Sequence, residues 1–215
     1  MLRSPAMILA WLLRAALAIA VVGGIWEGQL SIAFIAAATL ALTAAPHFLA
    51  RRLGVRLPAG IVAAIALFAF ATLFLGEVFD FYGRFWWWDV VLHFGSAVGF
   101  GLLAYLGIFM LFEGDRYAAP PIAIAILTFC VAMAIGAIWE VFEFGMDQIF
   151  GLNMQKSGLI DTMHDLIVDM AGAAIAALTA MLHLKGRHGP VLGGFLDEFV
   201  RLNRRLFAKV SSRGR

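Results

Sequence analysis

Six long apolar stretches divide the chain, and short groups of turn-forming or charged residues separate them. A helix needs about 20 mainly apolar residues to cross the hydrocarbon core of a bilayer. The stretches that meet this length are residues 6–26, 29–50, 59–80, 88–112, 120–145 and 161–184. The pattern therefore predicts an all-α integral membrane bundle of about six transmembrane helices.

The two ends of the chain carry weaker patterns. The run 7–25 contains Arg14 and leads into Trp26 and Glu27 without a clear small-residue cleavage site, so we expect a retained first helix rather than a signal peptide. Residues 195–210 alternate Phe, Leu and Val with basic residues, which is typical of a helix lying on an anionic membrane surface. We therefore divide the chain into a transmembrane domain, 1–186, and a basic amphipathic tail, 187–215.

Composition excludes several classes of protein. The chain is 63% hydrophobic and 14% charged, whereas soluble domains are roughly 45–50% apolar and about 25% charged. The single cysteine, Cys130, rules out an intrachain disulfide. The sequence contains neither a nucleotide-binding glycine loop nor a basic-aromatic nucleic-acid patch. We expect membrane lipids as partners and no nucleic acid, and the sequence identifies no protein partner.

Basic residues are distributed unevenly between the two sides of the predicted bundle. With six spans, 13 lysines and arginines fall on the side of the termini and only Arg84 and Lys156 on the other. The positive-inside rule assigns the basic side to the cytoplasm. Both termini and the basic tail are therefore expected to be cytoplasmic.

Acidic residues show the opposite distribution, because ten of the fourteen lie at or near the outer side. His93 and His164 lie at the same ends of the predicted spans. The ten residues are Glu27, Glu77, Asp80, Asp89, Glu140, Glu143, Asp147, Asp161, Asp165 and Asp169.

Helical spacing groups many of these residues on common faces. Asp89 and His93 are four residues apart, so they lie one turn apart on one face. Two further sets show the same kind of spacing: Glu140, Glu143 and Asp147, and Asp161, Asp165 and Asp169. Ionised carboxylates inside a span are costly unless they are paired, metal-bound, protonated or in contact with water. We therefore expect a shared polar cavity that opens to the outer face, lined by Asp89, His93, Glu140, Glu143, Asp165 and Asp169.

Carboxylates and imidazoles on three helices indicate a divalent-metal site. Oxygen ligands favour magnesium, manganese or calcium, and imidazole admits zinc or iron, so the metal's identity stays open. We expect His93, Glu140, Glu143 and Asp165 as metal ligands and Asp89, His164 and Asp169 as catalytic residues. Asp161 and His164 have the i, i+3 spacing of di-iron bundles, but no second copy of this element exists. The sequence indicates no other cofactor-binding residues.

Other polar or unusual residues have simpler interpretations. Solvated helix ends are as good an explanation as a site for Glu77, Asp80, Asp147 and Asp161. Arg14 is expected to snorkel or to pair structurally, and Trp86, Trp87 and Trp88 to mark the membrane interface. Gly95 and Gly99 form a small-xxx-small pair that predicts helix packing. His47, His183 and His188 are expected at the surface.

The polar segments also resemble a known family. They are Trp87-Trp88-Asp89-Val90-Val91-Leu92-His93-Phe94, Trp139-Glu140-Val141-Phe142-Glu143 with Asp147, and Gln155 followed by Asp161-Thr162 and Asp165-Leu166-Ile167-Val168-Asp169 with Gly172. Together they resemble the YjdF-like inner-membrane proteins and, more distantly, the VanZ-like proteins linked to glycopeptide resistance. The resemblance covers about 86–174. It implies a multi-pass protein of the bacterial inner membrane with important polar positions, and it implies no particular reaction.

Three classes of function remain open from the sequence. A metal-dependent hydrolase or transferase would use the outer acidic site to act on a lipid or lipid-linked substrate. A cation- or proton-coupled transporter would use the same carboxylates as ion sites. A structural or assembly subunit of a membrane complex is the third. The polar residues stop near the outer face, which disfavours transport, and we favour the enzyme.

Overall fold

The computed structural model describes residues 4–111, 119–187, 189 and 191–207. Those residues form α-helices, one π-helix and one 3-10 helix, and they contain no strand. Six helical segments are long and apolar enough to cross a membrane: α1 (Pro5–Trp26), α2 (Leu30–Arg52), α3 with η1 (Ala59–Val78), α5 (Trp88–Leu111), α6 (Pro121–Phe150) and α7 (Leu159–Leu184). The predicted all-α class with six spans is confirmed.

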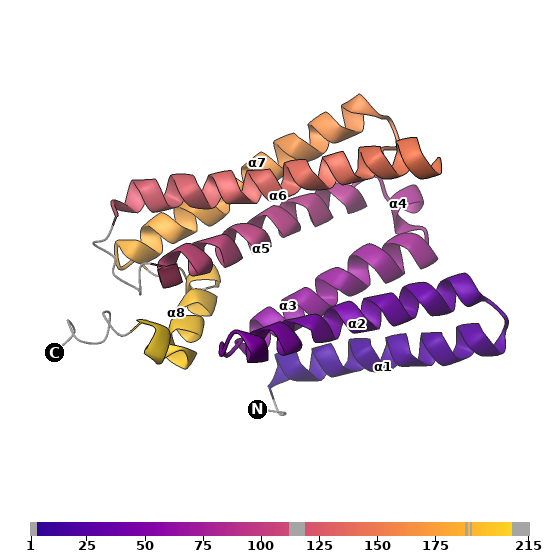
Figure 1. Cartoon of the computed structure of the whole chain (residues 1–215), viewed down its shortest axis with the longest axis horizontal. Helices are drawn as coiled ribbons and strands as arrows, with labels where there is room; N and C mark the ends of the chain where they lie inside the picture. The colour runs from indigo at the N-terminus through magenta and orange to yellow at the C-terminus, as the bar shows by residue number, and fades with distance from the viewer. Residues whose placement is uncertain (1–3, 112–118, 188, 190, 208–215) are drawn as a thin grey trace. The chain divides into compact units, whose positions relative to one another are not determined.

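Contacts between residues divide the chain into two compact units. Unit 1 runs through Trp88 and includes Arg201–Asn203, and unit 2 comprises Asp89–Val200 and the chain from Arg204. Figure 1 shows the helices of each unit in the order of the chain. The polar segments identified in the sequence fall in unit 2, apart from the tryptophans that precede Asp89.

Small residues allow close packing of the helices in unit 1. In α1 the buried residues Ala10, Leu17 and Gly24 recur every seven positions, and α1 packs against α2 and α3. A Cβ atom on Gly24 would lie 2.9 Å from the backbone nitrogen of Ala33. Close backbone approach through small residues is the usual way in which helices associate inside a membrane.

Arg14 lies inside the first span and is hydrogen-bonded to the second. Its Nε donates to Thr43 Oγ1 at 3.1 Å and its Nη2 to the Thr43 carbonyl at 2.5 Å. The guanidinium also lies 5.6 Å from the ring centroid of Trp11. These contacts agree with the expected structural pairing, because they satisfy part of a group that is costly to place in lipid.

The third span changes its helical geometry partway along. The α-helix α3 (Ala59–Ala69) continues as the π-helix η1 (Phe70–Val78), and the short helix α4 (Phe81–Arg84) follows. The Thr72 hydroxyl donates to the carbonyls of Phe68 and Ala69 at 3.0 and 3.3 Å. A Cβ atom on Gly76 would collide with the ring of Tyr82. The hydropathy pattern predicted the length of this span, but it did not predict that its second half is a π-helix.

In unit 2, α5 and α6 run antiparallel, and α7 runs parallel to α5. A Cβ atom on Gly101 of α5 would lie 3.5 Å from Ala132 of α6 and would collide with Ala176 of α7. A Cβ atom on Gly172 would lie 2.7 Å from the carbonyl oxygen of Phe94. These contacts fix a register in which α5 and α7 begin, and α6 ends, at the same end of the unit.

The expected packing role of two other glycines is not observed. A Cβ atom added to Gly95 or Gly99 would meet nothing within 4 Å among the residues that the structure describes. The close contacts of α5 and α7 use Gly101 and Gly172 instead. The small-xxx-small prediction therefore selected the wrong glycines of α5, because several faces of this helix carry small residues.

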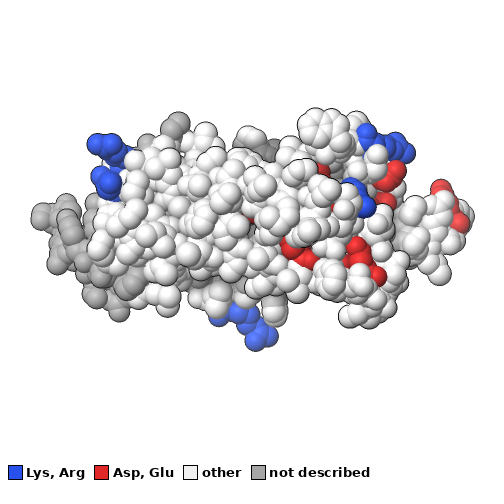
Figure 2. Space-filling view, turned by 90° about the horizontal axis from the view of Figure 1, so that it is seen from above, with Lys and Arg blue, Asp and Glu red and all other residues white. Residues whose placement is uncertain are grey.

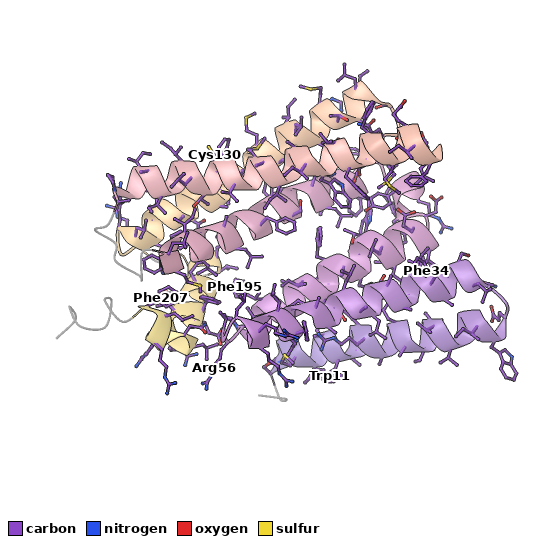
Figure 3. The ribbon with its side chains drawn as sticks, in the orientation of Figure 1. Trp11, Phe34, Arg56, Cys130, Phe195 and Phe207 are labelled. Atoms are coloured by element: carbon purple, nitrogen blue, oxygen red, sulfur yellow. The ribbon has the colours of Figure 1, made fainter. Side chains whose placement is uncertain are left out.

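The amphipathic tail packs on the protein. It forms α8 (Leu192–Leu202) and η2 (Arg204–Phe207), and its apolar side chains Leu196, Phe199 and Phe207 are buried. The ring of Phe207, labelled in Figure 3, stacks on Phe109 with centroids 5.3 Å apart. The apolar face of this helix is therefore used for packing within the chain, and its expected place on an anionic membrane surface stays a prediction. The rest of the predicted segment, 208–210, lies outside the described residues.

Apolar side chains project outward from the spanning helices. Trp11 is 52% exposed and Phe34 is 73% exposed, and both project from their helices in Figure 3. In Figure 2 most of the face drawn carries uncharged residues, and red acidic side chains appear towards one end. An apolar exterior of this kind is what lipid as solvent requires.

Candidate metal centre

The candidate site lies where the first turns of α5 and α7 meet the last turns of α6. α5 contributes Asp89 and His93, which are four residues apart on one face. The other buried acidic residues are Glu140 and Glu143 on α6 and Asp165 and Asp169 on α7. Each helix carries its pair at a spacing of three or four residues, so each pair faces inward. Contacts given below join Asp89, His93, Glu140, Asp165 and Asp169 in unit 2. The shared cavity that opens to the outer face stays a prediction.

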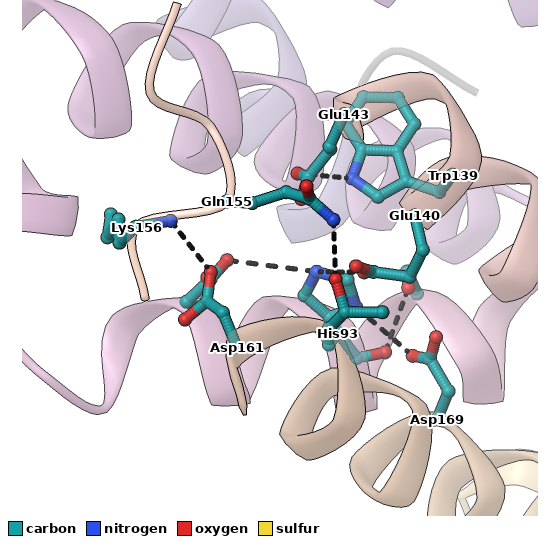
Figure 4. A network of polar contacts seen from close by, with 11 residues as sticks. His93, Trp139, Glu140, Glu143, Gln155, Lys156, Asp161 and Asp169 are labelled. Atoms are coloured by element: carbon teal, nitrogen blue, oxygen red, sulfur yellow. Dashed lines mark hydrogen bonds and ion pairs between the residues drawn. The ribbon is translucent and has the colours of Figure 1, made fainter. Parts of the chain in front are cut away.

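His93 is at the centre of this cluster. Its Nε2 lies 3.8 Å from Asp89 Oδ1 and 3.9 Å from Glu140 Oε1, and its Nδ1 lies 3.4 Å from Asp169 Oδ1. Figure 4 shows the imidazole of His93 close to Glu140 of α6 and Asp169 of α7. The two ring nitrogens therefore face different groups, with Asp169 on one side and Asp89 and Glu140 on the other.

One subset of the cluster has the spacing of a metal site. Asp89, His93 and Asp165 each offer a ligand atom, and these three atoms lie within 4.8 Å of one another. One imidazole and two carboxylates can ligate manganese, iron or zinc as well as harder ions. Asp89, expected as a catalytic residue, belongs to this ligand-competent group together with the expected ligands His93 and Asp165.

Several buried polar atoms of the cluster have no hydrogen-bond partner. They are His93 Nδ1, both carboxylate oxygens of Glu140, Asp165 Oδ2 and both carboxylate oxygens of Asp169. Asp169 is 1% exposed and Glu140 is 4% exposed. Buried polar atoms are normally hydrogen-bonded, and a buried charge without a partner is expensive. A bound cation would satisfy these oxygens, so the donor set fits a divalent metal.

Glu143 has a different environment from the other buried carboxylates. Its Oε1 accepts a hydrogen bond of 2.8 Å from Trp139 Nε1, one turn earlier on α6. Glu143 is not part of the three-residue group with metal-site spacing. The structure places this expected ligand at the edge of the cluster, where one of its oxygens is already in use.

His164 lies apart from the buried side chains of α7. Its side chain is exposed, whereas the neighbouring Asp165 is buried. Among the described residues, no hydrogen bond or ion pair joins His164 to His93 or to a carboxylate of the cluster. The reason is helical geometry, because adjacent residues point about 100° apart around a helix. The structure therefore gives no support to the expected catalytic role of His164.

Two further acidic residues hold the loop between α6 and α7. Asp147 accepts hydrogen bonds from the backbone nitrogens of Met154 and Gln155 at 2.7 and 2.9 Å. Asp161 accepts one from the backbone nitrogen of Lys156 at 3.2 Å. Gln155, in turn, donates to the Thr162 hydroxyl at 2.6 Å. We expected Asp147 and Asp161 to be either site residues or solvated helix ends. In the structure they instead order the loop beside the cluster through these hydrogen bonds.

Gly136 gives Asp169 its place beside α6. A Cβ atom at this position would collide with Asp169 Oδ2. Sequence reasoning missed this glycine, because nothing local distinguishes it from the other glycines of the spans. The register of α6 against α7 was the missing information.

Three expected outer acidic residues lie in unit 1 and are described separately. Glu27 accepts a hydrogen bond from Gln29 Nε2 at 3.0 Å. Asp80 adopts a left-handed backbone conformation with φ of 54°, immediately before α4. Glu77 and Asp80 are exposed. These residues have the features of helix ends and turns.

Three histidines outside the cluster were expected at the surface, and the structure tests this for two of them. His47 is exposed, as expected, and His188 lies outside the described residues. His183 is buried at 8% exposure, so the prediction that it lies at the surface is wrong. Its position at the end of an apolar helix suggested exposure, but α8 covers this end of the unit.

Comparisons with known proteins place the chain in a family. A protein of Thermotoga maritima described as "Uncharacterized protein" is 31% identical over 114 residues, which cover 53% of this chain and 57% of that protein's length. No solved structure matches the chain. The finer YjdF-like assignment stays a resemblance, and the VanZ-like one finds no support. Residues 8–186, most of the chain, match one family model, and the chain therefore belongs to the family described as "Predicted membrane protein (DUF2238)".

Proposed function

We propose that the cluster around His93 binds a divalent cation and that the protein is a metal-dependent hydrolase or transferase. The observation that carries the proposal is the set of buried carboxylate oxygens without hydrogen-bond partners on Glu140, Asp165 and Asp169. Unsatisfied buried carboxylates would destabilise the bundle, and a cation compensates for them while keeping them ionised.

Each residue of the cluster has a separate role in this proposal. Asp89, His93 Nε2 and Asp165 are the ligands, because they form the group with metal-site spacing. Asp169 Oδ1 faces His93 Nδ1 at 3.4 Å, an ion-pair distance at which the carboxylate orients the ring and leaves Nε2 for the metal. Glu140 is close to Nε2 and can complete the ligand set or accept a proton from an attacking water or hydroxyl. A bound divalent ion would polarise a phosphate or ester oxygen.

The surroundings of the cluster support a lipid or lipid-linked substrate. Ile138, Val141 and Phe142 on α6 and Ile160 and Ile167 on α7 are exposed, on the same turns as the buried carboxylates. Apolar side chains that face outward at this level would contact acyl chains. An amphiphile could therefore present its polar group to the cluster while its chains stay in lipid.

The metal content of purified protein tests this proposal. Wild-type protein, supplemented with manganese, zinc and magnesium and then dialysed, should retain close to one equivalent of metal. His93→Ala and Glu140→Gln should each lose most of it, and Glu27→Gln, which changes an exposed carboxylate in unit 1, should not. Equal, negligible metal in all four proteins would refute the metal site. Hydrolysis of phospholipid or lipid-phosphate substrates by metal-loaded protein then separates an enzyme from an ion-binding protein.

We also propose that the protein lies in the bacterial inner membrane with both termini in the cytoplasm. The 13-to-2 distribution of basic residues between the two sides supports this orientation. Reporter fusions after Arg56 and at the C-terminus should give cytoplasmic signals. Fusions after Arg84 and Lys156 should give periplasmic signals, and a cytoplasmic signal at either position contradicts the topology.

A second candidate function is a cation- or proton-coupled transporter. A specific observation favours it: unit 2 has a second polar group at the end opposite the cluster, in which the buried Tyr105 and His183 are linked to the exposed Asp197. The sequence argument against transport was that polar residues stop near the outer face, and this group removes that argument.

A further inference from the structure

Tyr105, His183 and Asp197 form a continuous hydrogen-bonded chain in unit 2. The Tyr105 hydroxyl lies 2.6 Å from His183 Nδ1, and His183 Nε2 lies 3.1 Å from Asp197 Oδ1. The three residues come from α5, α7 and α8. With a neutral imidazole, the Tyr105 hydroxyl donates to Nδ1, and Nε2–H donates to the Asp197 carboxylate.

Exposure increases steadily along this chain. Tyr105 is 0% exposed, His183 is 8% exposed, and the side chain of Asp197 is 47% exposed. Aromatic rings enclose the buried part, because Phe109 stacks on Tyr105 and meets the edge of His183. The chain thus has one end in water and the other in the interior of the unit.

The helix register places another buried polar group at the interior end. His93 lies beside Glu140, and Gly101 lies eight residues later on α5 beside Ala132, eight residues earlier on α6. The same antiparallel register brings Tyr105 level with Thr128. Thr128 is 0% exposed, and its hydroxyl has no hydrogen-bond partner. An unsatisfied hydroxyl in an apolar span is a second indication that this region handles a polar species.

A packed layer of small residues separates this region from the cluster around His93. The layer contains Gly101, Ala132 and Ala176, which meet across the three helices. From His93 to Tyr105 the twelve residues of α5 rise by about 18 Å. The two polar regions are therefore distinct sites, and neither is a part of the other.

We propose that Tyr105, His183 and Asp197 form a proton-transfer chain that connects the buried Tyr105 hydroxyl to water at α8. In the outward step, Tyr105 passes its hydroxyl proton to Nδ1 while the Nε2 proton moves to the Asp197 carboxylate, from which water removes it. In the return step, water protonates Asp197, and the same transfers run in reverse until Tyr105 regains its hydroxyl proton. Over the cycle one proton leaves to water and one enters from water, and the imidazole returns to its first tautomer.

A purely structural role is the main alternative, in which these bonds only dock α8. The two roles differ in what they predict for the exchange of the His183 imidazole proton with water. Weakening a docking hydrogen bond leaves this exchange unchanged or makes it faster. Removing the carboxylate of a relay makes it slower, because the proton loses its path to water.

NMR of the full chain in lipid nanodiscs, with ¹⁵N-labelled histidine, measures this exchange. Asp197→Asn keeps an oxygen that can accept the hydrogen bond and should slow exchange at His183 at least tenfold. Asp197→Glu restores the acid and should recover exchange to within about threefold of wild type. Glu198→Gln, the matched control on the same helix, should leave it unchanged. Unchanged or faster exchange in Asp197→Asn overturns the proposal, as does equal slowing in Glu198→Gln.

Tyr105→Phe gives a second, independent measurement. It removes only the hydroxyl and keeps the ring that stacks on Phe109. The relay predicts slower exchange of the His183 imidazole proton, because Nδ1 loses the hydroxyl whose proton replaces the one released to Asp197. Exchange in Tyr105→Phe that is as fast as in wild type, or faster, would also overturn the proposal.

Discussion

The two ends of unit 2 treat buried polar groups in opposite ways. Around His93, oxygens of Glu140, Asp165 and Asp169 are buried without hydrogen-bond partners. At the other end, both nitrogens of His183 are hydrogen-bonded, to Tyr105 and to Asp197. Buried charged groups without hydrogen-bond partners indicate a binding site for a ligand. A chain in which every group is hydrogen-bonded indicates a proton path or a contact that docks a helix. Two helices, α5 and α7, thus take part in both kinds of polar site, and α6 and α8 each complete one of them.

The largest expected effect is the stabilisation of the first end by a cation. A ligand at a hundred times its Kd adds about 2.7 kcal/mol to the free energy of unfolding. Manganese or zinc should therefore raise the thermal midpoint of wild-type protein in detergent. His93→Ala should abolish this increase and Tyr105→Phe should preserve it, as measured by tryptophan fluorescence. Equal increases in wild type and His93→Ala would remove the contrast between the two ends.

Gly136→Ala should have the next largest effect. The new methyl group collides with Asp169, which then loses its position beside His93. Groups that orient a metal-bound histidine typically contribute 10- to 100-fold to metal affinity, so we expect a loss of about that size. Gly95→Ala is the matched control, because its methyl group meets no described atom within 4 Å. Isothermal titration with manganese measures both, and equal affinities would show that Asp169 is not a positioning residue.

At the second end, Tyr105→Phe should destabilise the fold without affecting metal. The substitution leaves His183 Nδ1 buried without its partner, at a cost of about 1 to 2 kcal/mol. Denaturant unfolding in mixed micelles measures this change. Metal content should remain that of wild type, and a parallel loss of metal would show that the two ends are coupled.

The smallest expected effect concerns the loop that lies beside the first end. Gly151 closes α6 with φ of 66°, a conformation that favours glycine. Gly151→Ala should therefore cost about 1 kcal/mol. Gly145→Ala, within α6 and open to space, is its control and should stabilise slightly or have no effect. The thermal midpoint of Gly151→Ala should therefore lie below that of Gly145→Ala.

Hydropathy predicted the helices well, because every span must satisfy its backbone internally and present apolar side chains to lipid. Helical spacing also predicted the inward faces that carry His93, Glu140 and Asp169. These features depend only on residues close together in the sequence. The same local information predicted the exposure of His47.

Relations between helices were beyond the reach of the sequence. The proximity of Asp89 to Asp165 depends on how α5 and α7 are aligned, and that of Gly136 to Asp169 on how α6 and α7 are aligned. His183 looked like a surface residue because the helix that covers it follows nearly ten residues later. Glu143 could not be distinguished from Glu140 until the hydrogen bond to Trp139 was seen. Each of these depends on a packing partner that no local pattern specifies.

The length of α6 has a consequence for where the protein meets its lipid. Its 30 residues span about 45 Å, against a hydrocarbon core about 30 Å thick. At the usual tilt of about 20° the helix is still longer than the core by about 12 Å. If that excess projects on the outer side, it includes Glu143 and leaves Glu140 within a turn of the boundary, close to the depth of the glycerol esters. Headgroup chemistry could then occur without lifting a lipid out of its leaflet.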